Sequence, residues 1–263
     1  AYNINNVLVN EGTRVKFTAT GGFFVDQTNT AITYENEYYS SVKNGVAAVI
    51  FRAGTDADSI LIDATIGNVS AAKKKKIIVL PGVPKIITLD EATAMVTSVP
   101  VNSNSISISG TLQDDYNNPI QNRVVNFTTT VGSITPIVTT TNEGHFTAEF
   151  IPGSVSGSAK IDIAADSAKA TKIIQVTSSA VQYMRFTNEG VIGLNLQGSG
   201  GVESTPLSVK LFDNNGNLVS TPVHKVKFSF ASPNHPAGVK INGEDDPAPV
   251  TAYGGIATVS ISS

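Results

Sequence analysis

The sequence predicts an all-β protein built from tandem β-sandwiches. Alternation of apolar and polar residues with a period of two recurs along the whole chain, whereas helical periodicity is scarce. The alternating runs are rich in Val, Ile, Thr and Phe and are bounded by Gly, Pro, Asn and Asp. Short strands with frequent turns are typical of sandwiches. The expected strands include residues 13–20, 105–112, 123–130, 145–150, 207–212 and 224–230.

Composition narrows the class of protein. The 263 residues are 41% hydrophobic, which is enough to form packed cores. The chain has no Cys, so it carries no disulfide, thiolate metal site or cysteine nucleophile. A net charge of -3 argues against a nucleic-acid partner, which would require a basic surface. No stretch approaches the roughly 20 apolar residues of a membrane helix, so we expect no direct membrane span.

Internal repeats indicate how the chain is divided. One repeat has a basic residue, a β-branched residue and Phe in alternating register, and a second has a Gly turn followed by alternating apolar residues. The first occurs at 11–22, 121–132 and 223–233, and the second at 43–54, 142–153 and 253–263. The last two copies of the first repeat are about 100 residues apart, the size of one sandwich domain. We therefore predict domains at 1–82, 83–177 and 178–263.

The repeats also predict that the first and last domains are incomplete. The first lacks counterparts of the initial strands of the second domain, and the third lacks counterparts of its final strands. Such domains would expose unpaired strand edges. Either the chain is an excerpt of a longer array or neighbouring chains supply the strands. The start at Ala1 rather than Met favours a processed or excised segment and export.

Residues 110–165 carry a run of motifs that resembles one family. A strand leads to the turn DDYNNP, then to the strand VVNFTTT, the turn TNEGHF and the strand GSAKIDI. This order resembles the bacterial immunoglobulin-like (Big-1 type) repeats of the invasin/intimin adhesins. The resemblance covers nearly all of the second domain, and residues 42–68 and the third domain resemble parts of the same repeat. It implies secretion and rod-like stalks at the bacterial surface, outer membrane-anchored or secreted.

Two oxygen-rich turns are the candidate metal sites. The first contains Asp114, Asp115, Asn117 and Asn118, and the second contains Asp213, Asn214, Asn215 and Asn217. Carboxylate and amide oxygens suit calcium. Neither turn has the spacing of an EF-hand, however, and the same residues supply the left-handed backbone angles and side-chain caps of hairpin turns. A turn is therefore the first interpretation and a calcium site the alternative; we expect no other cofactor.

Other polar clusters have a structural and a functional interpretation. Tyr34, Tyr38 and Tyr39 would either pack across strands or form a contact surface for protein or glycan. The lysines of residues 71–79 would protect a sheet edge or bind an anionic surface. The acidic loop 243–249 would be a solvated loop or a ligand site. His145, His224 and His235 are paired with no recognisable nucleophile or metal motif, so we expect no enzyme.

These observations predict a structural or adhesive rod segment of a bacterial cell-surface protein, which spaces or presents a binding surface. Its partners would be neighbouring immunoglobulin-like domains and a host protein or glycan. The alternatives are a self-assembling extracellular filament or sheath subunit completed by strands from neighbouring chains, and a glycan- or protein-binding module. The predicted core positions are Val15, Phe17, Val125, Phe127, Val226 and Phe228.

Overall fold

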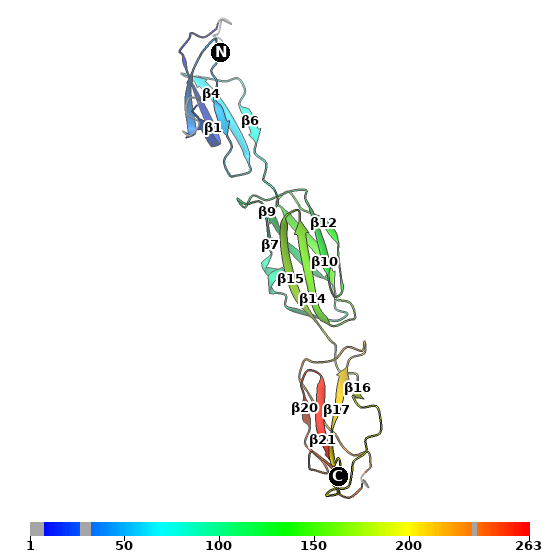
Figure 1. Ribbon diagram of the computed structural model, residues 1–263. Helices are drawn as coiled ribbons and strands as arrows, with labels where there is room; N and C mark the ends of the chain where they lie inside the picture. Colours follow the sequence, from blue (N-terminus) through cyan, green and yellow to red (C-terminus); the bar gives the residue numbers. More distant parts are fainter. Residues whose placement is uncertain (1–7, 27–32, 233–235) are drawn as a thin grey trace.

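The computed structural model describes residues 8–26, 33–232 and 236–263. The sheets fall into three groups along the chain, and these lie end to end with the termini at opposite ends (Figure 1). We name the groups the N-terminal unit (β1–β6), the central unit (β7–β15) and the C-terminal unit (β16–β21). The all-β prediction is confirmed. No helix in the described part of the chain is long and apolar enough to cross a membrane.

The central unit is a sandwich of two sheets. One sheet has the strand order β12-β10-β14-β15-β8 and the other β11-β13-β9-β7. Neighbouring strands are antiparallel except β8, which runs parallel to β15. The strands are β7 (Ile86–Leu89), β8 (Ser98–Pro100), β9 (Ile106–Gln113), β10 (Val124–Thr129), β11 (Ser133–Ile134), β12 (Ile137–Thr139), β13 (His145–Ile151), β14 (Gly157–Ala165) and β15 (Ala168–Thr177).

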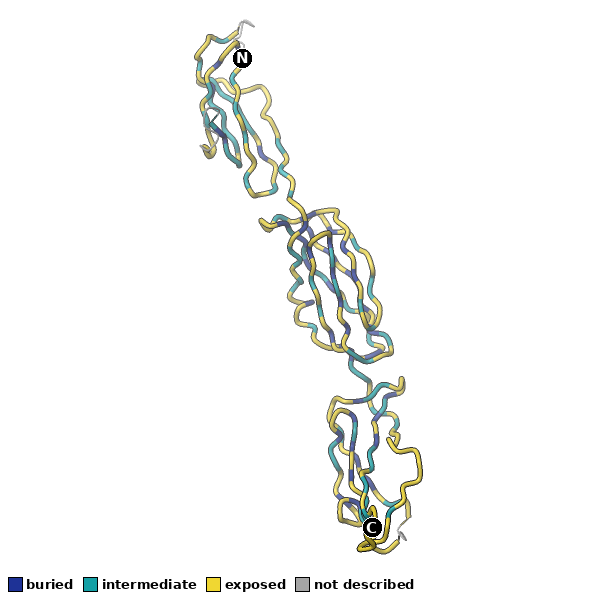
Figure 2. Tube along the Cα trace, in the orientation of Figure 1, coloured by how far each residue is buried: buried dark blue, intermediate teal, exposed yellow. Residues whose placement is uncertain are grey.

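Alternation along these strands produces the core of the central unit. In β13 every second residue is buried, which places Phe146, Ala148 and Phe150 between the two sheets. Figure 2 shows buried residues running through the strands of this unit. Gly110 of β9 is required by close packing, since a Cβ there would lie 2.4 Å from the carbonyl oxygen of Thr88. The predicted core residues Val15, Val125, Phe127, Val226 and Phe228 are buried, and Phe17 is half-buried.

A short helix is the element that sequence periodicity did not predict. The helix α1 (Glu91–Met95) lies between β7 and β8 and spans five residues. Thr93 is buried, and its Oγ1 accepts a hydrogen bond from the backbone N–H of Ser109 at 2.9 Å. A helix this short has no room for an amphipathic period, so its position depends on contacts with β9.

The N-terminal unit is a single curled sheet. Its order is β2-β1-β4-β5, with β3 also paired to β1 and β6 to β4. The register of β1 shifts between Thr18 and Phe23, where Gly22 has a φ of +73°. Lys75 and Lys76 lie on β6, which pairs only with β4 in the described part of the chain. The strands are β1 (Arg14–Val25), β2 (Thr33–Ser41), β3 (Ile50–Arg52), β4 (Ser59–Ile66), β5 (Val69–Ser70) and β6 (Lys75–Ile78).

The C-terminal unit has a four-stranded sheet of order β16-β17-β21-β19 and the pair β18-β20. The strand predicted at 224–230 is shorter than expected and ends at Val226. Among the described residues β18 pairs only with β20, whereas its counterpart β10 has partners on both edges. The strands are β16 (Tyr183–Phe186), β17 (Ser204–Phe212), β18 (His224–Val226), β19 (Lys240–Ile241), β20 (Val250–Ala252) and β21 (Ile256–Ser262).

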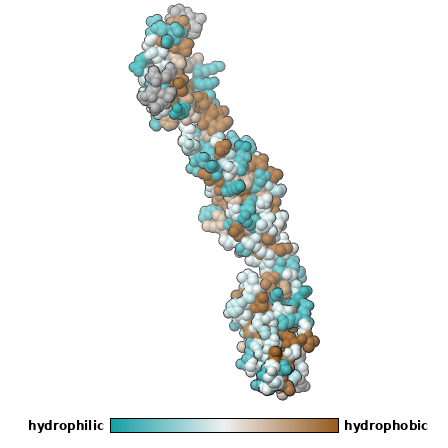
Figure 3. Space-filling model, in the orientation of Figure 1, coloured by the Kyte–Doolittle hydropathy of each residue, from teal (hydrophilic) through white to brown (hydrophobic). Residues whose placement is uncertain are grey.

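An exposed apolar segment connects β16 to β17. Val191, Leu196 and Val202 are exposed at 103%, 80% and 60%. In the central unit the corresponding connection contains β8, which pairs with β15. No strand in the described residues of the C-terminal unit takes the place of β15, so this segment has no sheet edge to join. Elsewhere, hydrophobic residues are scattered among hydrophilic ones on the face shown in Figure 3.

Candidate functional site: the joints between consecutive units

The two oxygen-rich turns lie where one unit meets the next. The first connects β9 to the chain leading to β10, and Asn117 there adopts a φ of +64°. The second follows β17, and Gly216 there has a φ of +82°. Both turns are closed by a backbone hydrogen bond from the N–H of the aspartate to the carbonyl of the asparagine four residues later, 3.1 Å at Asp114 and 3.0 Å at Asp213. The turn geometry is that expected from Asp, Asn and Gly at such positions.

The first aspartate of each turn is buried and binds N–H groups. Asp114 is 3% exposed, and its Oδ1 accepts hydrogen bonds from the backbone N–H groups of Tyr116 and Asn118, both at 2.9 Å. Its Oδ2 accepts from the Asn118 side chain at 2.9 Å and from the backbone N–H of Gly82 at 2.8 Å. Gly82 belongs to the connection between the N-terminal and central units. The carboxylate therefore holds both its own turn and the linker.

The second turn repeats this arrangement. Asp213 is fully buried, and its Oδ1 accepts from the backbone N–H groups of Asn215 and Asn217, both at 2.9 Å. Its Oδ2 accepts from the Asn217 side chain at 3.0 Å and from the backbone N–H of Ser179 at 3.0 Å. Ser179 lies in the linker that leads to β16. Both carboxylates therefore accept hydrogen bonds from equivalent positions: the residues two and four positions later in the turn and one residue of the linker.

Hydrogen bonding lowers the pKa of both carboxyl groups. Burial alone would raise the pKa of Asp114, but the hydrogen bonds from the side chain of Asn118 and from backbone N–H groups outweigh it and lower the pKa to about 2. Burial likewise opposes the shift at Asp213, where Asn217 and its backbone neighbours lower the pKa to about 2. Both groups are therefore ionised at neutral pH and stabilised by N–H donors.

The asparagine that ends each turn contacts the preceding unit. Asn118 Oδ1 accepts a hydrogen bond from the backbone N–H of Ala57 at 2.8 Å, and its Nδ2 donates to the carbonyl oxygen of Thr55 at 2.6 Å. Thr55 and Ala57 lie in the loop between β3 and β4 of the N-terminal unit. The amide thus binds two backbone groups two residues apart, as a neighbouring strand would.

Asn217 makes the equivalent contacts with the central unit. Its Oδ1 accepts from the backbone N–H of Ser156 at 3.0 Å, and its Nδ2 donates to the carbonyl oxygen of Ser154 at 2.7 Å. The sequence separations are 61 and 63 residues at both joints. We call Asp114 with Asn118 the first clamp and Asp213 with Asn217 the second clamp. Sequence reasoning found both turns but missed these contacts; the repeated D-x-x-x-N spacing was the available signal.

The remaining candidate calcium ligands are exposed, in contrast to the two buried aspartates. Asp115 and Asn117 are exposed, as is Asn215 of the second turn. No group of three or more His, Cys, Asp or Glu side chains in the described ranges is arranged to hold a metal ion. Calcium binding at these turns stays an untested prediction.

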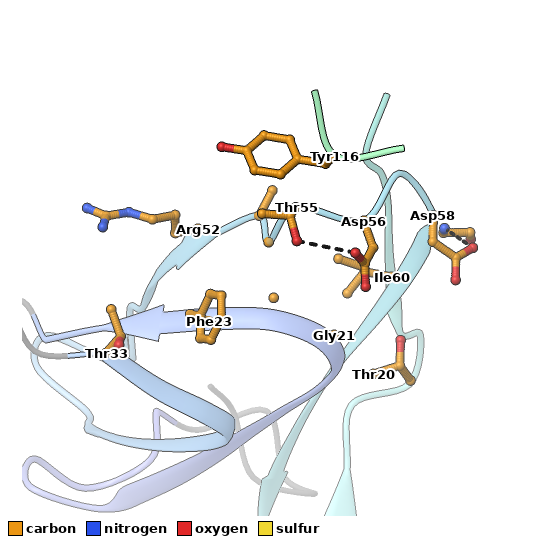
Figure 4. Close-up of a pocket in the computed structure, with 14 residues that line it drawn as sticks. Thr20, Gly21, Phe23, Thr33, Arg52, Thr55, Asp56, Asp58, Ile60 and Tyr116 are labelled. Atoms are coloured by element: carbon orange, nitrogen blue, oxygen red, sulfur yellow. Dashed lines mark hydrogen bonds between the residues drawn. The ribbon is translucent and has the colours of Figure 1, made fainter. Parts of the chain in front are cut away.

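A groove of about 580 Å³ lies beside the first joint. Figure 4 shows the ring of Tyr116, from the central unit, on one side of the groove and Phe23 of β1 on the other. Arg52, Asp56 and Asp58 are among the other lining residues. The groove therefore combines two aromatic rings with charged groups of both signs.

The three tyrosines of β2 line one pocket together with Arg14. Tyr34 and Tyr38 contact each other with ring centroids 5.2 Å apart, and Tyr38 lies 6.4 Å from the buried ring of Phe24. Tyr39 is 43% exposed, and the Arg14 guanidinium lies 4.4 Å from its ring centroid.

The other polar candidates are the acidic loop 243–249 and the three histidines. In the acidic loop, Asp246 pairs with Lys227 and Asp245 pairs with Lys240, both at 2.6 Å. His145 begins β13, and His224 lies on β18 with a buried Nε2 that has no hydrogen-bond partner. His235 lies outside the described residues.

Comparison with known proteins supports the fold. The sequence matches no protein-family model and no curated protein. The structure is similar to that of Yersinia pseudotuberculosis InvD, with a TM-score of 0.51 and 18% identity over 98% of this chain and 74% of that one.

A crystal structure titled as invasin, a bacterial integrin-binding protein, gives a TM-score of 0.49 and 17% identity over the whole of this chain. The chain spans 49% of the length of that invasin structure. The chain therefore has a tandem immunoglobulin-like β-sandwich fold, similar to that of InvD.

Proposed function

We propose that the chain is a structural or adhesive rod segment of a bacterial cell-surface protein, composed of Big-1 type units, which spaces or presents a binding surface. The observation that carries this proposal is the repetition of one clamp at both joints. A stalk must hold its tip at a defined distance and direction from its base, and repeated joints of the same geometry serve that purpose. The sequence motifs that resemble invasin/intimin repeats, and the fold shared with InvD, support the same function.

The proposed domains are 1–82, 83–177 and 178–263. The described sheets within these ranges share no strand with one another, and separate apolar clusters lie in the central and C-terminal units. Limited proteolysis should cut first in the linkers near Pro81 and Ser179. Early cleavage within β10 or β14 would contradict the proposed boundaries.

Two measurements test the rod proposal. Small-angle scattering of the chain should show an elongated particle, and a compact profile would contradict it. Antibodies against the central unit should label intact cells of the source bacterium, and brief protease treatment of those cells should remove the label. Labelling that requires permeabilised cells would contradict surface exposure.

A second candidate function is ligand binding in the groove beside the first joint. The groove has the volume typical of small-ligand sites, and its aromatic, carboxylate and guanidinium groups suit a saccharide. The tyrosine cluster of β2 is a further proposed contact surface for a host protein or glycan. Glycan-array binding that is lost in Tyr116→Ala but retained in Tyr253→Ala would support the groove. Binding that survives Tyr116→Ala would exclude it.

A further inference from the structure

We propose that Asn118 and Asn217 set the angle between consecutive units, each by binding the backbone of the preceding unit while the aspartate of the same clamp holds the linker. This inference rests on the proposed rod function and adds how the rod keeps its shape. It also identifies the docking partner of each clamp, which is a backbone N–H and a backbone carbonyl two residues apart in the loop of the preceding unit.

Both N–H groups and the oxygen of the Asn118 side-chain amide are hydrogen-bonded. One N–H of the Asn118 amide faces Asp114, the other faces the Thr55 carbonyl, and the amide oxygen accepts from Ala57. The amide is planar, so these partners constrain its orientation. Because Asp114 also binds the backbone N–H of Asn118, the side chain is held in position before it contacts the preceding unit.

A linker held by the central unit alone would leave a pivot. The hydrogen bonds of Gly82, Pro84 and Lys85 hold the linker on the central unit, but they do not fix rotation of the N-terminal unit about the linker. The two bonds between Asn118 and the preceding unit are made outside the linker, and they restrict this rotation. The bond from Gly82 has an ionised acceptor and is therefore stronger than a neutral one, whereas the two bonds from Asn118 are neutral and act through their positions.

The side chains of the docking loops differ while the hydrogen bonds are the same. The first loop presents Thr55, Asp56 and Ala57, and the second presents Ser154, Val155 and Ser156. Recognition therefore depends on main-chain geometry rather than on side-chain identity. A clamp of this kind is transferable, since it will dock on any unit whose loop offers the same two backbone groups.

Spin-label distance measurements on the full chain test the proposal directly. The chain has no Cys, so labels can be introduced without removing native residues. Asn68→Cys with Lys169→Cys spans the first joint, and Lys169→Cys with Tyr253→Cys spans the second; all three positions are exposed. We expect a narrow distance distribution across each joint when both clamps carry their native residues. Asn118→Ala should lose the narrow peak at the first joint only, and Asn217→Ala at the second only.

Matched controls lie in the same turns. Asp115→Ala and Asn214→Ala change exposed neighbours whose side chains are not part of either clamp, and they should keep the narrow peaks. Asn118→Asp places a second carboxylate beside Asp114 and the Thr55 carbonyl, so it should broaden the distribution at least as much as Asn118→Ala. Hydrogen exchange of β9 and β13 reports whether the central unit stays folded in the variants of the first turn, and exchange of β17 and β21 reports the same for the C-terminal unit in the variants of the second turn.

Several outcomes would overturn the inference. One is a distribution that stays narrow in both alanine variants, and another is a distribution that is already broad at the intact joints. Equal broadening in the Asp115→Ala control would attribute the effect to the turn rather than to Asn118. None of these results bears on surface labelling of cells, so failure of the clamp and failure of the proposed function are distinguishable.

Discussion

The side chain of Asn217 donates a hydrogen bond to the carbonyl oxygen of Ser154 at 2.7 Å, although the two residues are 63 positions apart and belong to different units. Asn118 and Thr55 are related in the same way at the other joint, with the same separation. The same contact therefore recurs at the same sequence separation at both joints of the rod. Its dependence on an ionised aspartate makes the joints sensitive to acid.

We expect the joints to hold from neutral pH down to about pH 4 and to loosen between about pH 4 and pH 2. The pKa of Asp114 and of Asp213 is lowered from its ordinary value of 3.8 to about 2 in the folded chain. A lowered pKa stabilises the folded state above the unfolded pKa, and this stabilisation is lost as the pH falls through the folded pKa. Each carboxylate would contribute up to about 2 kcal/mol at neutral pH.

Joint-spanning distance distributions recorded at pH 7, 4 and 2 check this expectation. Asp162 has a lowered pKa as well, through hydrogen bonds from Lys160 and Thr171, so acid affects the central unit independently. The double variant Asp114→Asn, Asp213→Asn isolates the joint contribution, because its distributions should no longer change between pH 4 and pH 2. An unchanged width at pH 2 in the parent chain would show that ionisation is irrelevant to the joints.

Replacing Phe127 with Ala should destabilise the central unit by about 3–5 kcal/mol, because it leaves a cavity between the two sheets. Phe127 is 2% exposed, and its ring packs edge-on against Phe146 with centroids 5.7 Å apart. The units have separate cores, so hydrogen exchange in β9 and β13 should be followed rather than one global transition. Ile173→Ala is the control, since Ile173 lies on β15 of the same unit and is 54% exposed. Equal protection in the two variants would refute the assigned core.

Calcium should have no effect on the melting temperature. Calcium takes six to eight oxygen ligands in proteins, whereas both carboxylate oxygens of Asp114 already accept N–H donors. Melting curves recorded with millimolar calcium and with a chelator should coincide. A calcium-dependent rise that disappears in Asp115→Ala would establish the alternative prediction of a metal site.

The exposed segment between β16 and β17 should promote self-association at high concentration. Val191, Leu196 and Val202 are exposed in one connection, and clustered exposed apolar residues mark interaction surfaces. Light scattering across a concentration series should show a rising mean mass. Val191→Lys with Leu196→Lys should suppress it, whereas Val155→Lys, an exposed site in the central unit, should not. A constant mass in the parent chain would argue against the filament alternative.

Strand periodicity and turn composition were sufficient to predict the all-β class and five buried core residues. Val125 and Phe127 alternate with polar residues in the sequence, and β10 buries both. Alternation is a local property, because successive side chains of a strand point to opposite faces whatever the strand pairs with. The same reasoning overextended β18, since strand length depends on partners that local sequence does not reveal.

The sequence by itself also determined where the two Asp/Asn turns occur and that they repeat. Only the tertiary structure decided what those turns bind. The turn conformation follows from Asp, Asn and Gly within five residues, whereas the contacts of Asn118 and Asn217 require a loop some sixty residues earlier to lie within hydrogen-bond distance. That proximity arises from the path of the linker between packed units, a long-range property that no local pattern encodes.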